Sequence, residues 1–160
     1  MPQAGPFYSF DTSSLIHAWR RAYPPHRFAS VWTAFDALID EGRMLASIEV
    51  FHELKKKDDD VHAWAKDRKE ALFREIDDEV QAEVVRLMAT YPRLVDTKTG
   101  KSGGDPFVIA QALAASPRLT IVSEEAGGSL KPPKIPYVCQ QEGLRIINLL
   151  TLIEDEDWTF

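Results

Sequence analysis

Short runs of β-prone residues alternate along the chain with longer stretches of helical periodicity, and this alternation constrains the fold most strongly. The β-prone runs are residues 7–10, 44–47, 119–123 and 144–149. Strands that are separated by helices need crossover connections, which join parallel strands and place helices on both faces of the sheet. The sequence therefore predicts an α/β fold with three layers, α/β/α, and a central, mainly parallel sheet.

Apolar residues three or four positions apart mark the helical stretches between these runs. Gly42 and Pro92 each follow such a stretch and act as stop signals. No internal repeat or obvious linker divides the chain, so residues 1–160 are expected to form a single domain. Two segments rich in Gly, Lys or Pro, 96–104 and 125–136, are predicted to be flexible loops. The predicted helices cover residues 28–39, 48–54, 61–72, 76–91 and 107–115.

Composition narrows the class of protein further. Cys139 is the single cysteine, which excludes an internal disulfide and a CxxC metal site. The N-terminal sequence lacks the pattern of a signal peptide, and nowhere do about 18 apolar residues run together, so we expect a soluble, cytoplasmic protein with no membrane partner. The formal net charge of −6 weighs against non-specific binding to nucleic acids.

Carboxylates recur where open α/β sheets bind ligands, beyond the carboxyl ends of the strands. Asp11 directly follows the first β-prone run, and Glu124 and Glu125 follow the third. Glu53 stands in the helix after the second run, and Asp105 begins the apolar helix over residues 107–115. A group of carboxylates repels itself unless cations neutralise it, and hard Mg²⁺ or Mn²⁺ ions prefer oxygen ligands. The pattern favours a divalent-metal site.

Each of these acids also has a plain structural explanation. Asp11 and Asp105 are both placed to be helix N-caps, the latter with Pro106 at the first helical position. Glu53 could be a solvated helix residue, and the two later glutamates could be loop charges. The residues alone therefore leave a metal site and a set of ordinary caps and surface charges both open.

Four segments follow one another along the chain, FDTSSLI at 10–16, SIEVFHEL at 47–54, GDPFVIA at 104–110 and TIVSEE at 120–125, and a tail follows them at 134–149. The four segments resemble the motifs of PIN-domain nucleases, and within them those of a PIN-like group whose members look like toxins of toxin–antitoxin pairs. The tail resembles the closing helix and strand of that subgroup.

The resemblance implies a set of functional residues. Ser13 matches the small polar residue that steadies the first carboxylate or the water of the metal. The family's fourth acid stands two residues after a Thr or Ser, here after Ser123, where this chain has a glutamate in place of the usual Asp, with Glu124 as the alternative. The implied metal-binding and catalytic carboxylates are Asp11, Glu53, Asp105 and Glu125.

The function that the resemblance implies is metal-dependent hydrolysis of RNA with Mg²⁺ or Mn²⁺, in which a metal-bound water attacks the phosphodiester. It also implies a cognate antitoxin and a homodimer as partners. Lysines near the acids could guide the RNA backbone, although those that follow Glu53 could equally be a favourable helix C-terminus. These lysines are Lys55, Lys56, Lys57, Lys98 and Lys101.

Two other functions compete with this one. The first is a catalytically inactive PIN fold that binds RNA or protein. The second is a phosphohydrolase with Asp11 as nucleophile. It is disfavoured because such enzymes usually carry a second acid two residues after the nucleophile, where this chain has Ser13. The histidines and two tryptophans are assigned to packing or the surface, namely His17, His26, His52, His62, Trp32 and Trp64.

Overall fold

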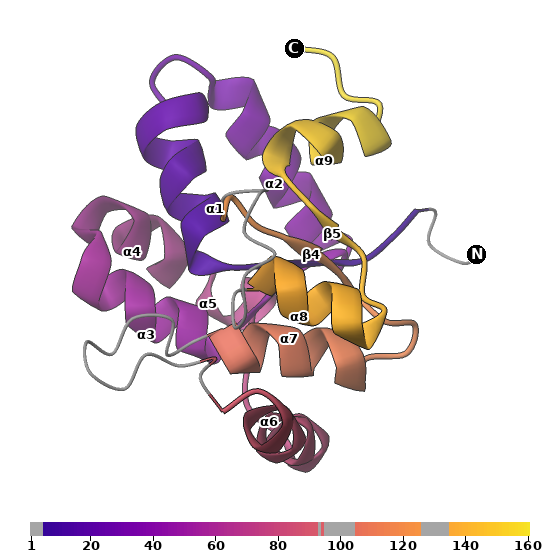
Figure 1. Cartoon of the computed structure of the whole chain (residues 1–160). Helices are drawn as coiled ribbons and strands as arrows, with labels where there is room; N and C mark the ends of the chain where they lie inside the picture. Colours follow the sequence, from indigo (N-terminus) through magenta and orange to yellow (C-terminus); the bar gives the residue numbers. More distant parts are fainter. Residues whose placement is uncertain (1–4, 93, 95–104, 126–134) are drawn as a thin grey trace.

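A computed structural model of the chain describes residues 5–92, 94, 105–125 and 135–160 (Figure 1). Its centre is a sheet of five short strands in the order β3-β2-β1-β4-β5, and every neighbouring pair is parallel. The strands are β1 (Tyr8–Phe10), β2 (Met44–Ser47), β3 (Phe73–Arg74), β4 (Thr120–Val122) and β5 (Ile146–Ile147). The parallel α/β sheet predicted from the sequence is confirmed.

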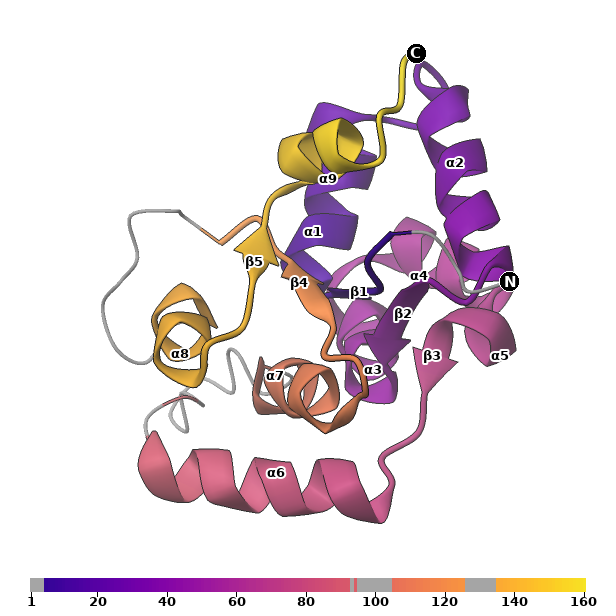
Figure 2. The ribbon, with the colours of Figure 1, turned by 90° about the vertical axis from the view of Figure 1, so that its right-hand side faces the viewer.

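Helices cover both faces of the sheet (Figure 2). On one face α7 packs across β1, β2 and β4, with α6 outside it and α8 beside it; α1, α2 and α9 lie on the other face. The helices are α1 (Thr12–His17), η1 (Ala18–Ala22, a π-helix), α2 (Ala29–Asp40), α3 (Ile48–Lys57), α4 (Asp59–Lys66), α5 (Lys69–Leu72), α6 (Asp78–Thr90), α7 (Asp105–Ala114), α8 (Ile135–Glu142) and α9 (Leu149–Asp155).

The predicted helix over residues 61–72 is wrong, because the structure contains two helices there, α4 and α5. The break falls at Arg68, whose guanidinium donates to the carbonyl of Trp64 at 3.0 Å and to the carboxylate of Asp36 on α2 at 2.6 Å. The break between α4 and α5 thus coincides with a long-range ion pair between Arg68 and Asp36, which the periodicity of apolar residues cannot reveal.

Two predicted boundaries are also wrong, and in each case a side chain that caps a helix decides the boundary. The Asp77 carboxylate accepts the Val80 N–H at 2.8 Å, so α6 begins at Asp78 and not at residue 76. Asn148 accepts the Thr151 N–H at 2.9 Å, so Leu149 begins α9 and the last strand stops at Ile147.

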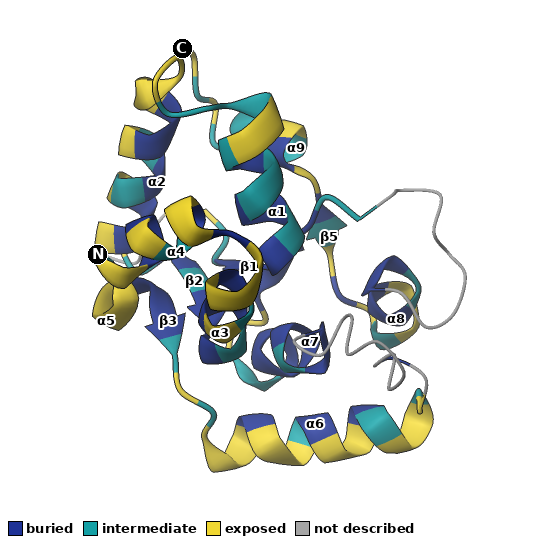
Figure 3. Ribbon diagram, turned by 90° about the vertical axis from the view of Figure 1, so that its left-hand side faces the viewer, coloured by how far each residue is buried: buried dark blue, intermediate teal, exposed yellow. Residues whose placement is uncertain are grey.

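The core lies on both faces of the sheet, and Figure 3 shows α7 as its most buried helix, whereas α6 buries only one side. The expected burial of the helix that follows Asp105 is therefore confirmed. Trp32 and Trp64 are 6% and 8% exposed and meet edge to face at 5.1 Å between ring centroids, which confirms them as core residues.

A buried ion pair joins the end of α9 to the starts of β1 and β2. The Arg43 guanidinium donates to both carboxylate oxygens of Glu156, with Nη1 at 2.9 Å, and its Nε donates to the carbonyl of Pro6 at 3.1 Å. The hydroxyl of Tyr8, the first residue of β1, donates to the same Glu156 carboxylate. This network lies at the amino ends of the strands, opposite to the edge where ligands bind in such sheets.

Within the described parts of the chain, no helix is both long and apolar enough to cross a membrane.

Candidate functional site

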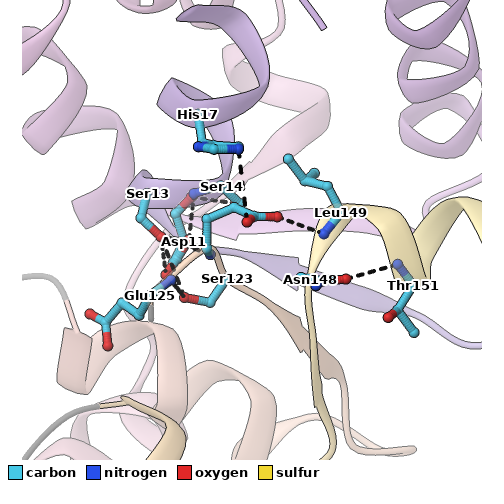
Figure 4. A network of polar contacts seen from close by, with 10 residues as sticks. Asp11, Ser13, Ser14, His17, Ser123, Glu125, Asn148, Leu149 and Thr151 are labelled. Carbon is cyan, nitrogen blue, oxygen red and sulfur yellow. Dashed lines mark hydrogen bonds and ion pairs between the residues drawn. The ribbon is translucent and has the colours of Figure 1, made fainter. Parts of the chain in front are cut away.

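Asp11 occupies the carboxyl end of β1 and caps the N-terminus of α1, and it is only 2% exposed. Its carboxylate accepts the Ser14 N–H at 2.8 Å and the Ser13 hydroxyl at 2.8 and 2.9 Å. The Ser123 hydroxyl, which comes from the end of the neighbouring strand β4, donates to it as well (Figure 4). The carboxylate is therefore held in one orientation from both strands, and its capping role and its candidate site role coexist.

The environment of Asp11 disfavours its charged form. Burial raises the pKa of Asp11 from 3.8 to about 6, and the negative charge of Glu125 adds to the rise, while the hydrogen bonds from Ser123, Ser14 and Ser13 oppose it. A buried carboxylate with a raised pKa is typical of functional sites, because a cation or substrate group then supplies the missing compensation.

Glu53 lies on α3 and is connected to the first motif through Thr12. The Thr12 hydroxyl donates to Glu53 Oε1 at 2.8 Å, and Lys57 Nζ lies 3.5 Å from Glu53 Oε2. The Glu53 side chain is 17% exposed, so it is not a freely solvated helix residue. The sequence prediction had no role for Thr12; its place directly after Asp11 in the first motif was the only available signal.

Asp105 is buried at the first position of α7, the helix that crosses β1 and β4. Burial raises the pKa of the Cys139 thiol in α8 to about 12, with further contributions from the charges of Asp11, Glu125 and Asp105. A thiol with this pKa stays protonated at neutral pH and is a poor nucleophile.

The two consecutive glutamates after β4 have different environments. Glu124 Oε1 accepts the N–H of Leu149 at 2.8 Å at the start of α9, and its Oε2 lies 4.0 Å from His17 Nε2 (Figure 4). Glu125 Oε2 accepts the N–H of Ile135 at 3.2 Å at the start of α8. Glu124 therefore has a structural role in holding α9, which no local pattern in the sequence indicated.

Metal binding can be assessed from the donor set. In the ranges that the structure describes, no three Asp, Glu, His or Cys side chains converge into a group that could hold an ion. The chemistry of the acids nevertheless fits Mg²⁺ or Mn²⁺: the donors are hard oxygens, and Mg²⁺ commonly takes one or two protein carboxylates and keeps several waters. The acids therefore form no closed cage among the described residues. We call the carboxyl ends of β1 and β4, with Asp11, Glu124 and Glu125, the acidic edge of the sheet.

The lysines predicted to guide RNA have different positions. Lys57 lies beside Glu53, as described above, whereas Lys55 and Lys56 are exposed on the same helix. Lys98 and Lys101 lie outside the described residues, as does most of the two predicted loops.

A large pocket of about 730 Å³ opens next to these acids, between α8, β5 and α9. Glu124 and Glu125 form one wall, and Gln140 and Asn148 contribute amide groups to a lining that also contains apolar residues such as Ile146. Ligand pockets in proteins typically combine an apolar lining with a few polar groups, and this one is directly continuous with the acidic edge.

Comparison with known proteins identifies the fold and the family. No curated protein matches the chain. Among solved structures, it is similar to a chain in the crystal structure of VapBC2 from Rickettsia felis bound to a DNA fragment from their promoter, with 14% identity, a TM-score of 0.52, and coverage of 89% of this chain and 98% of that chain. At this identity the likeness concerns the fold, which is PIN-like. The family described as a domain of unknown function, DUF4411, matches residues 8–160, and the chain therefore belongs to this family.

Proposed function

We propose that this protein is a metal-dependent endoribonuclease that hydrolyses RNA phosphodiester bonds, and that it is the toxin of a toxin–antitoxin pair. The observation that carries the proposal is the buried Asp11 carboxylate, oriented by three donors at the carboxyl end of β1 and coupled to Glu125. The PIN-like fold that the chain shares with the VapBC2 structure supports the nuclease class and the toxin role.

The proposed site uses the residues as follows. Asp11, Glu53, Asp105 and Glu125 are the acids that would hold Mg²⁺ or Mn²⁺, and the ion would lower the pKa of a bound water so that hydroxide forms near neutral pH. Ser13 and Ser123 fix the orientation of Asp11, and Thr12 fixes that of Glu53. No side-chain nucleophile is required, in agreement with the protonated state of the Cys139 thiol.

The test is cleavage of a mixed pool of single-stranded and structured RNA by the purified protein in Mg²⁺, Mn²⁺ or EDTA. We expect cleavage that needs the metal and is lost in Asp11→Asn, because the amide removes the negative charge of a buried carboxylate that three residues orient. Asp40→Asn, an exposed acid at the end of α2, is the matched control and should cut like the wild type.

Cleavage in EDTA, or undiminished cleavage by Asp11→Asn, would contradict the proposed mechanism. A folded protein that binds RNA or a partner protein but cuts no RNA in either metal would instead favour the inactive-module alternative. Trapping of a phosphoryl group on Asp11 would favour the phosphohydrolase.

The toxin role predicts two properties in cells and in solution. Expression of the chain alone should arrest growth, and co-expression of the antitoxin should restore it, because the antitoxin would block the acidic edge. We also expect a homodimer in solution, measured by sedimentation equilibrium. A chain that is monomeric and harmless when expressed alone would speak against the toxin role and leave the chemistry untouched.

A further inference from the structure

A second pocket, of about 300 Å³, opens on the other side of the acidic edge, between α1, η1 and the end of α3. Thr12 and Ser13, the residues that hold Glu53 and Asp11, form its inner wall. The remaining polar lining consists of His17, Arg20, Arg21 and Lys57 together with one acid, Glu124. In a chain of net charge −6, a pocket lined by two arginines and a lysine, next to the residues that hold Asp11 and Glu53, is a local concentration of positive charge.

The cations of this pocket differ in how far their charge is already used. Arg20 donates to Asp58 at 2.7 Å from two nitrogens and to Asp60 at 2.9 Å, so two carboxylates neutralise it. Lys57 lies 3.5 Å from Glu53. The exposed Arg21 has no hydrogen bond or ion pair to any residue within the described ranges. Its guanidinium is therefore available to an anion from outside.

We propose that this pocket binds a backbone phosphate of the RNA adjacent to the phosphate that is cut, with Arg21 as the principal contact. The proposal rests on the nuclease function proposed above. A guanidinium can bind two phosphate oxygens at once through parallel N–H groups, which a lysine cannot do. Lys57 adds a second positive charge, and the Thr12 and Ser13 side of the pocket connects the bound phosphate to the acidic edge.

The arrangement answers an electrostatic problem of the proposed site. Four carboxylates repel the RNA backbone at the place where it must approach, and the whole chain is acidic. A compact cationic pocket next to the acids offsets this repulsion locally and fixes the register of the strand, as phosphate contacts do in other nucleic-acid complexes. An acidic peptide from a partner protein offers similar charges, but the small volume and the direct continuity with the acids favour a phosphate.

The first experiment compares Arg21→Gln with Arg118→Gln in binding a labelled single-stranded RNA, by fluorescence anisotropy in EDTA over a series of KCl concentrations. Arg118 is an exposed arginine just before β4, at the amino ends of the strands and therefore away from the pocket. Both variants replace an arginine with a glutamine and so make the same change in charge. We expect Arg21→Gln to weaken binding about tenfold and to reduce the slope of log K against log salt by about 0.7, the value for one phosphate contact on a single strand. Arg118→Gln should bind like the wild type.

Equal binding by the two variants would overturn the proposal, as would a wild-type protein that binds no RNA. So would displacement of the RNA by an acidic peptide as readily as by an oligonucleotide of equal charge, which would assign the pocket to a protein partner. In cleavage assays Arg21→Gln should raise KM and leave kcat unchanged, because the contact forms equally in the ground and transition states.

The same experiments separate this proposal from the nuclease function. Loss of RNA binding in Arg21→Gln, together with no cleavage by the wild type in any metal, would keep the phosphate pocket and reject the nuclease. Metal-dependent cleavage with an unchanged KM in Arg21→Gln would keep the nuclease and reject the pocket.

Discussion

Replacing Glu156 with alanine is expected to lower the free energy of unfolding by about 3–5 kcal/mol, the usual cost of removing one partner from a buried ion pair. The Arg43 and Glu156 side chains are only 7% and 9% exposed, so the variant leaves a guanidinium charge buried without its main partner. The hydroxyl of Tyr8 loses its acceptor as well. Urea denaturation at an unchanged m-value is the measurement.

Two further variants make this prediction specific. Glu154→Ala, which replaces an exposed acid in the last turn of α9, should change the free energy of unfolding by less than about 0.5 kcal/mol. Arg43→Met combined with Glu156→Leu should recover most of the lost stability, since the cost comes from an uncompensated charge and not from the missing pair itself. If Glu156→Ala were as mild as Glu154→Ala, the network would not be buried in solution.

Asp11→Asn is expected to stabilise the metal-free protein at neutral pH, by up to about 3 kcal/mol for a pKa raised from 3.8 to about 6. The folded state binds the Asp11 proton more tightly than the unfolded state, so the wild type loses stability as pH rises from about 4 to about 6, and the full cost is present above that range. Asparagine removes the charge and can still accept the Ser14 N–H, since Asn and Asp are equally good N-caps.

The measurement is the melting temperature of both proteins in EDTA across this pH range. The difference between them should be near zero at pH 4 and largest above pH 7. Adding Mg²⁺ or Mn²⁺ at ten times Kd should add about 1.4 kcal/mol to the free energy of unfolding of the wild type and so raise its melting temperature. The melting temperature of Asp11→Asn should not change. A less stable Asp11→Asn in EDTA would mean that the hydrogen bonds to the carboxylate outweigh its burial.

The parts of the fold that the sequence predicted are those set by local pattern. The apolar run after Asp105 is a buried helix, and residues 7–10 contain a strand that ends at Phe10, directly before Asp11. The strand β3 was missed because two residues, Phe73 and Arg74, are too few to produce a period. It forms because Phe73 and Arg74 pair with the end of β2, which is a tertiary contact.

The candidate site shows the same limit. Local motifs identified the acids, but their partners come from distant segments: Thr12 and Glu53 are 41 residues apart, and Glu124 and Leu149 are 25 apart. That Arg21 has no ion pair among the described residues also escaped prediction, because only the structure shows that neighbouring Arg20 is the one bound by Asp58. Whether Arg20 or Arg21 forms the ion pair with Asp58 depends on the folded arrangement of the chain, which the local sequence does not reveal.

Helix α9 is held at both of its ends. One attachment lies at the carboxyl ends of the strands and the other at their amino ends. Its first N–H is bound by Glu124 beside the acidic edge, and Glu156, which directly follows the helix, is bound by Arg43 and Tyr8 at the amino ends of β1 and β2. The amide proton of Leu149 is thus a natural reporter: its protection from hydrogen exchange depends on the position of Glu124, and Glu124 is the residue next to Ser123, the partner of Asp11. We therefore expect a ligand at the acidic edge that contacts Glu124 to change the hydrogen exchange of the Leu149 amide, which reports on the site without a label.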